Sequence, residues 1–170
     1  MRNNGDVEEE RNTEGGERMN VETAKETPRR FEIIIEGNPT PKARPRFCRR
    51  GNYVGTYKKR GEQAIEDEFR YRAKEQLKKQ GLRLPTPKDV AISISFEFVF
   101  AIPKSYTKKK RAELLGREHT NKPDLDNLLK FYIDGLNGIA YSDDSQIARY
   151  GEACKIWGEK PRTRIIIDIL

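Results

Sequence analysis

The chain has 170 residues, with 36% charged and 35% hydrophobic residues and a formal net charge of +7. This length suits one domain, and two distant cysteines, Cys48 and Cys154, argue against a disulfide framework or a zinc site. There is no apolar run of membrane-spanning length and no hydrophobic region typical of a secretion signal, so we expect a soluble, cytoplasmic protein without a membrane partner.

Charge and apolar content divide the chain into two parts. Residues 1–28 contain no aromatic residue and few apolar ones, which predicts a disordered tail. Residues 29–170 are expected to form a single domain. From residue 31 onward the chain carries 28 basic and 19 acidic residues, so the predicted domain is more basic than the whole. Basic charge alone is also found in proteins that never bind nucleic acid.

The first predicted elements are a strand and a basic segment. Residues 31–36 alternate apolar and acidic side chains, which is typical of a strand. Residues 42–60 hold eight Lys or Arg and no acid, and their glycines and proline favour a loop or short hairpin. Contacts to phosphates provide affinity without reading bases. The candidates for DNA binding here are Lys42, Arg44, Arg46, Arg49, Arg50, Lys58, Lys59 and Arg60.

A helix and a long strand follow. Residues 62–80 place Ile65, Phe69 and Leu77 at helical spacing, and the glycine after residue 80 suits the end of a helix. Residues 90–100 alternate large apolar residues with small or polar ones, which predicts a strand with one buried face.

The remaining pattern completes an α+β fold. A short helix is predicted at 108–115 and a longer one at 124–136, and residues 146–157 and 162–170 are predicted to form a closing β-hairpin. The expected order is β-α-β-(short α)-α-β-β. We therefore predict a small mixed β-sheet with helices packed on it, in a homodimer.

Two groups of acids suggest chemistry. On the helix predicted from residue 124, Asp126, Lys130 and Asp134 form a polar stripe beside an apolar arc. Asp124 would be the N-cap, where an extended backbone could turn its carboxylate toward Asp126. The adjacent pair 143–144 precedes the next strand and could supply one more carboxylate.

These acids favour a metal site. A divalent cation held by Asp124, Asp126 and Asp144 would polarise a phosphodiester and acidify a bound water, and Lys130 would offset the charge of the transition state. No Ser-His-Asp set competes, because His119 is the only histidine.

An ordinary structural interpretation stays open. Asp124 could simply cap the helix, Asp126 and Lys130 could form an exposed pair, and residues 143–144 could be a turn. A basic nucleic-acid-binding module without catalysis is the alternative function.

The motifs resemble the RusA family of Holliday junction resolvases, especially its phage and prophage branch. The resemblance rests on D-L-D-N-x-x-K at 124–130, D-G-L at 134–136 and Y-S-D-D-S-Q-I at 141–147, with similar segments at 39–46 and 100–105.

The resemblance implies a fold, an activity and a site. It implies catalytic aspartates at Asp124, Asp126 and Asp144, a catalytic lysine at Lys130, and Mg²⁺ or Mn²⁺ as cofactor. It also implies a homodimer that nicks two strands of a four-way DNA junction symmetrically, in recombination and repair. The segment after Asp126 is about one residue shorter than in the best-known member, so the third ligand stays open between Asp143 and Asp144.

Overall fold

The computed structural model describes residues 29–43, 46–51, 53–57 and 60–170. The expected disordered tail, 1–28, lies outside the described residues. In the described part, no helix combines the length and apolar character needed to cross a membrane. The element bounds are β1 Arg30–Glu36, β2 Arg46–Arg50, β3 Tyr53–Tyr57, α1 Arg60–Lys79, β4 Ile92–Ala101, α2 Lys108–Leu114, α3 Leu125–Leu136, the 3₁₀ turn η1 Asp144–Gln146, β5 Ile147–Gly158 and β6 Arg162–Ile169.

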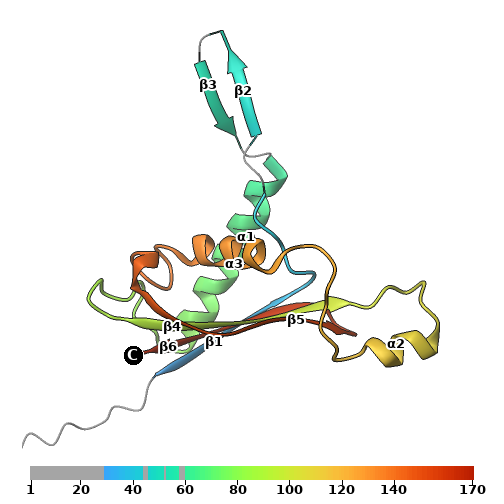
Figure 1. The fold of residues 1–170 in the computed structure, drawn as a ribbon. Coiled ribbons are helices and arrows are strands. Elements are labelled where there is room, and N and C mark those ends of the chain that lie inside the picture. Colours follow the sequence, from blue (N-terminus) through green and yellow to red (C-terminus); the bar gives the residue numbers. More distant parts are fainter. Residues whose placement is uncertain (1–28, 44–45, 52, 58–59) are drawn as a thin grey trace, which may run out of the picture.

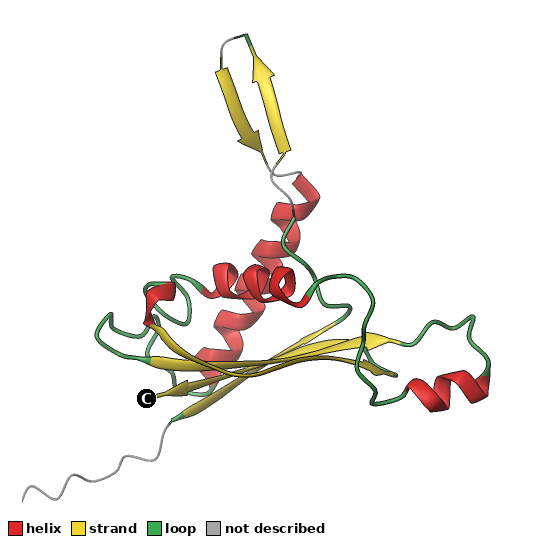
Figure 2. Cartoon of the chain, viewed as in Figure 1, coloured by secondary structure: helices red, strands yellow, loops and turns green. Residues whose placement is uncertain are grey.

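A mixed four-stranded sheet is the centre of the fold, with strand order β1-β6-β4-β5 (Figure 1). β4 pairs with β6 in the antiparallel sense and with β5 in the parallel sense. The basic segment forms a separate hairpin, β2–β3. Helices α1 and α3 lie over one face of the sheet (Figure 2). The predicted α+β fold with a small mixed sheet is thus confirmed.

The predicted closing hairpin is wrong. Both strands form, but β4 lies between β5 and β6, so these two consecutive strands are not neighbours. The turn after Gly158 carries the chain past the end of β4, where Ile102 N donates to Gly158 O at 3.1 Å. The physical reason is that β4 has the most apolar helix-facing side and is central, whereas residues 148–152 of β5 are exposed and suit an edge.

The two faces of the sheet differ sharply in polarity. Apolar residues of alternate positions, such as Ile33, Phe98 and Ile165, are fully buried beneath the helices. The opposite face carries ion pairs across neighbouring strands: Arg30 with Asp168 at 2.7 Å, Arg162 with Glu97 at 2.9 Å, and Arg164 with Glu32. Because its arginines are already paired with acids, this face offers less free positive charge to a polyanion.

Helix α1 protects one edge of the sheet with two glutamines. Ile34 N donates to Gln76 Oε1 at 2.9 Å, and Gln76 Nε2 donates to Ile34 O at 2.8 Å. Gln80 makes the same pair of bonds to the N–H and C=O of Glu32, at 2.9 and 2.6 Å. These amides satisfy backbone groups that an edge strand would otherwise expose to pairing with another chain.

The helical spacing in α1 predicted three core residues, of which two are buried. Phe69 is 3% exposed and Leu77 is 0% exposed, but Ile65 is 46% exposed. The first turns of α1 extend toward the β2–β3 hairpin (Figure 1), and Ile65 lines an open pocket with Ile35 of β1 instead of packing in the core. Periodicity alone does not show where a helix leaves the body of a domain.

Helix α3 packs against both the sheet and α1. Phe131 and Tyr132 both contact the Phe69 ring of α1, with ring centroids 5.7 and 5.0 Å apart. Gly135 lies against the same ring, and a Cβ atom at this position would approach Phe69 Cε1 to 2.5 Å. A close helix crossing therefore requires glycine here.

We expect Gly135→Ala to destabilise the protein by about 1–3 kcal/mol, because the added methyl overpacks a filled core. Gly61→Ala is the matched control: Gly61 is exposed in the first turns of α1, an added methyl would meet nothing within 4 Å, and alanine favours helix there. Urea unfolding measures both. Equal stabilities for G135A and the wild type would contradict the close packing of α3 on α1.

Candidate active site

Asp124 is the N-cap residue of α3, and its carboxylate makes no capping hydrogen bond. Its backbone is extended, at φ −70° and ψ 146°, and its carbonyl accepts from Leu128 N at 3.2 Å, as expected for an N-cap. The side chain makes no capping hydrogen bond and is exposed. An N-cap aspartate ordinarily accepts from a backbone N–H of the first turn. Asp124 therefore keeps its carboxylate oxygens for another ligand.

The polar stripe of α3 has the geometry expected from its sequence. Asp126, Lys130 and Asp134 are all exposed, while Leu128 and Leu136 of the opposite arc are fully buried. Asp134 forms an ion pair with Lys42, with 2.7 Å between Oδ2 and Nζ. Within the described ranges, the side chains of Asp126 and Lys130 form no hydrogen bond or ion pair, so the simple exposed-pair interpretation is not observed.

The segment before the basic hairpin runs along this helix. Thr40 N donates to Tyr132 Oη at 3.0 Å, and Lys42 N donates to Asn127 O at 2.9 Å. Tyr132 Oη also accepts from Thr163 Oγ1 at 2.9 Å, and burial raises the pKa of this phenol. These hydrogen bonds hold residues 40–42, which lead into the hairpin, against α3.

The acidic pair before β5 has two different roles. Asp143 Oδ1 accepts from Ser145 N at 3.0 Å, and Gln146 Oε1 accepts from Asp143 N at 3.1 Å. Hydrogen bonding with the side chain and the backbone of Ser145 lowers the pKa of the Asp143 carboxyl. Asp143 is therefore the cap of η1. Asp144 is exposed, and in the described chain its side chain has no hydrogen bond or ion pair.

The free carboxylates lie at opposite ends of α3. Asp124 and Asp126 are at its start, and a twelve-residue helix is about 18 Å long. Tyr141 Oη donates to Ile133 O at 2.7 Å, so the chain leading to Asp144 packs on the other end. Burial raises the pKa of Tyr141, and the charge of Asp144 raises it further. Figure 1 shows η1 beyond that end.

The structure consequently does not bring the three predicted ligands together in one chain. Among the described residues, no three His, Cys, Asp or Glu side chains are close enough to hold one metal ion. The donors at the start of α3 are nevertheless of the right chemistry, since Mg²⁺ takes one or two carboxylates and completes its shell with water and phosphate oxygens. Asp124 and Asp126 fit that requirement, and Asp144 of the same chain is separated from them by the helix.

The DNA-binding candidates are only partly described. Arg44, Lys58 and Lys59 lie outside the described residues. Arg46, Arg49 and Arg50 are in β2, and Arg60 begins α1. Lys42, with its ion pair to Asp134, is already engaged within the protein.

His119 is a core residue. It is 5% exposed, and its ring packs between Phe100 and Trp157, with centroids 4.2 Å from each. Burial lowers the pKa of His119, and the charge of Lys155 lowers it further, so the imidazole is neutral at pH 7. These contacts support a structural role rather than contact with phosphate.

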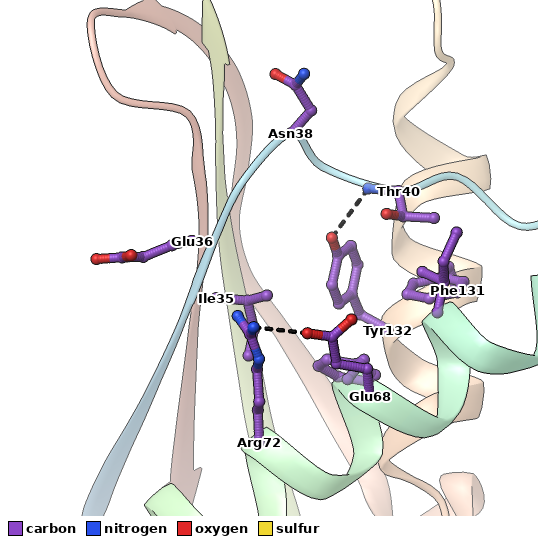
Figure 3. A pocket seen from close by; sticks show the side chains of 10 residues that line it. Ile35, Glu36, Asn38, Thr40, Glu68, Arg72, Phe131 and Tyr132 are labelled. Carbon is purple, nitrogen blue, oxygen red and sulfur yellow. Dashed lines mark hydrogen bonds and ion pairs between the residues drawn. The ribbon is translucent and has the colours of Figure 1, made fainter.

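A pocket between β1, α1 and α3 is distinct from these residues (Figure 3). It is lined in part by Thr40, Phe131 and Tyr132, and by Glu68, whose carboxylate pairs with Arg72 at 2.6 Å. None of the predicted catalytic or DNA-binding residues lines it. The carboxylates of α3 are instead on an open surface, which suits a substrate as large as DNA.

Fold and site together define a class of protein. It is a small basic α+β domain that presents free carboxylates and a lysine on the exposed face of one helix, as a phosphodiesterase would. Comparison with known proteins agrees. The family model described as Endodeoxyribonuclease RusA matches residues 36–168. The chain belongs to the RusA family of endodeoxyribonucleases, and the family predicted from the sequence motifs is confirmed.

Two relatives are informative. The "Crossover junction endodeoxyribonuclease rusA" of Lactococcus phage r1t is 33% identical over 138 residues, covering 81% of this chain and 95% of the phage protein. The "Uncharacterized protein YqaN" of Bacillus subtilis (strain 168) is 35% identical over 80 residues, covering 45% of this chain and 56% of that protein. The phage relative therefore matches across nearly its whole length, and YqaN across about half.

Proposed function

We propose that the protein is a homodimeric, metal-dependent endonuclease that resolves four-way DNA junctions by paired symmetric nicks. The observation that carries this proposal is the uncommitted state of Asp124 and Asp126 in a member of an endodeoxyribonuclease family. The near full-length similarity to a crossover junction endodeoxyribonuclease supports the choice of substrate. By this proposal the substrate is recombining bacterial, phage or prophage DNA in the cytoplasm.

Each residue has a role set by its chemistry. Asp124 and Asp126 would hold Mg²⁺, with Mn²⁺ as a substitute, through hard carboxylate oxygens. When bound, the ion supplies Lewis-acid stabilisation of the phosphodiester and lowers the pKa of a coordinated water. Lys130, one turn after Asp126 and unpaired in the described chain, places an ammonium where negative charge develops on the phosphate oxygens.

The separation of the carboxylates supports a shared site. If Asp144 is the third ligand, it must come from a second copy, because α3 separates it from Asp124 and Asp126 in its own chain. In a two-fold dimer, Asp144 of each copy would complete the site formed by Asp124 and Asp126 of the other copy. The dimer would then have two equivalent metal centres. Two centres related by a two-fold axis also suit a junction that is cut at two related strands. Asp144 is the better candidate than Asp143, whose carboxylate caps η1.

DNA binding would depend on the basic charge around this helix. Lys and Arg of residues 42–60, together with the exposed face of α3, would contact the sugar-phosphate backbone. Such contacts recognise the shape of a branch without reading bases. The chain that enters the hairpin would run past the start of α3, where Lys42 N donates to Asn127 O.

The direct test uses purified protein with a synthetic four-way junction and a linear duplex, each with Mg²⁺ or with EDTA. We expect paired, symmetric nicks in the junction in Mg²⁺, no cleavage in EDTA, and little cleavage of the duplex. Denaturing gels of each labelled strand locate the nicks. Binding to the junction without cleavage under every metal condition would instead identify a nucleic-acid-binding module without catalysis.

A further inference from the structure

Lys155 of β5 makes two hydrogen bonds that the sequence motifs did not suggest. Its Nζ donates to the backbone carbonyls of Asn121 at 2.9 Å and of Pro123 at 2.8 Å. Pro123 immediately precedes Asp124, so the second bond is to the peptide unit that leads into the N-cap. Bonds from a charged donor are stronger than those between neutral groups.

Two neighbouring sets of hydrogen bonds hold the main chain before Asp124 against the sheet. Trp157 N donates to Arg117 O at 2.8 Å, and His119 N donates to Lys155 O at 2.8 Å. The buried His119 ring between Phe100 and Trp157 adds to this first anchor. Beyond residue 119, the Lys155 side chain ties the backbone carbonyls of Asn121 and Pro123 to the sheet. The Lys155 side chain therefore extends these attachments to Pro123, the residue before Asp124.

We infer that Lys155 is a positioning residue for the proposed active site. By holding the carbonyls on either side of residue 122, it fixes where α3 begins and where the Asp124 carboxylate lies. This inference rests on the proposed function, because it assigns Lys155 to a site formed around Asp124 and Asp126. The ammonium is engaged with carbonyls, so Lys155 acts through the backbone and does not contact phosphate.

The test compares Lys155→Met with Lys155→Arg, in the full chain. Loss of a residue that orients a metal ligand typically costs about 10–100-fold in metal affinity or activity. We expect K155M to need about tenfold more Mg²⁺ for half-maximal junction cleavage. It should also bind Mn²⁺ more weakly when measured without DNA by electron paramagnetic resonance. K155R keeps a charged donor for both carbonyls and should restore most of the metal affinity.

A matched control separates positioning from loss of charge. Lys160→Met removes one positive charge from the exposed turn between β5 and β6 and should leave the metal requirement unchanged. The salt dependence of junction binding in EDTA is the second readout. A lost phosphate contact would reduce the slope of log K against log salt by about 0.9. We expect the slope of K155M to equal that of the wild type.

Two outcomes would overturn the inference. One is a K155M protein with the wild-type Mg²⁺ requirement, and the other is a reduced salt slope, which would make Lys155 a phosphate contact. If K155M does not fold, as judged by circular dichroism, Lys155→Gln replaces it, because glutamine lacks the charge and the reach. Asp124→Asn is measured in parallel: cleavage by D124N would refute the proposed active site itself, whereas an inactive D124N beside a normal K155M would refute only the positioning role.

Discussion

Asn at position 124 or 126 should stop junction cleavage and leave junction binding intact. Both substitutions keep the size of the side chain and remove the charge that a divalent cation requires. Lewis-acid stabilisation of a phosphodiester transition state is worth several kcal/mol, and each 1.4 kcal/mol is about tenfold in rate. We therefore expect the cleavage rate of D124N and of D126N to fall at least about a hundredfold. Because Asp124 makes no capping bond, D124N should also keep its stability.

The measurement is single-turnover cleavage of a labelled junction, with binding followed separately by gel shift in EDTA. Glu113→Gln is the control: Glu113 is an exposed acid of α2, and Figure 1 shows α2 well apart from α3. E113Q should cleave at the wild-type rate. Full activity in D124N or D126N would refute the proposed site. Equal loss of binding and cleavage would mean that the substitutions act on the DNA interface and not on the reaction.

Local patterns were sufficient to predict most elements of this fold. The alternation in β4 and the two-sided pattern of α3 follow from side-chain periods that are set by the backbone. The pairing of β5 with β4 does not follow from such patterns. A short turn between two strands favours a hairpin in sequence, but the partner of a strand depends on which strand is most buried, and that is a property of the whole sheet.

The sequence motifs indicated candidate residues for the site but not the geometry of that site. The motif identified Asp124, Asp126 and Lys130, and the structure shows why they are available: none of their side chains is engaged in the described chain. Our preference for Asp144 over Asp143 as a ligand rests on the capping bond between Asp143 and Ser145, which no spacing shows. The separation of Asp144 from Asp124 and Asp126 follows from the length of α3, which lies between them in the chain.

Lys155 could not be found from sequence, because its partners are carbonyl groups. Backbone acceptors are the same at every position, so the sequence carries no signal for such a bond. Only the three-dimensional path of residues 120–123 past β5 reveals it. Positioning residues of this kind are therefore the part of a site that motif comparison misses most easily.

Mixed dimers should distinguish a shared site from a site within one chain. If Asp126 of one copy and Asp144 of the other serve the same centre, a dimer of D126N with D144N has one centre with both defects and one intact centre. Such dimers, purified through two different affinity tags, should nick at about half the wild-type rate per dimer. They should give single nicks in place of paired ones. Each variant alone, as a homodimer, should be inactive.

The control is a mixed dimer of D124N with D126N. Both residues are at the same end of α3, so each centre of this dimer has one defect and neither can be restored. Cleavage by the dimer of D126N with D144N, and no cleavage by the dimer of D124N with D126N, would show that each centre combines residues of both copies. Inactivity of both mixtures would place the whole centre within one chain, and would require Asp144 to move past the length of α3 before cleavage. Sedimentation of the wild type as a monomer at assay concentrations would contradict the shared site independently, because a single copy leaves its carboxylates at opposite ends of the helix.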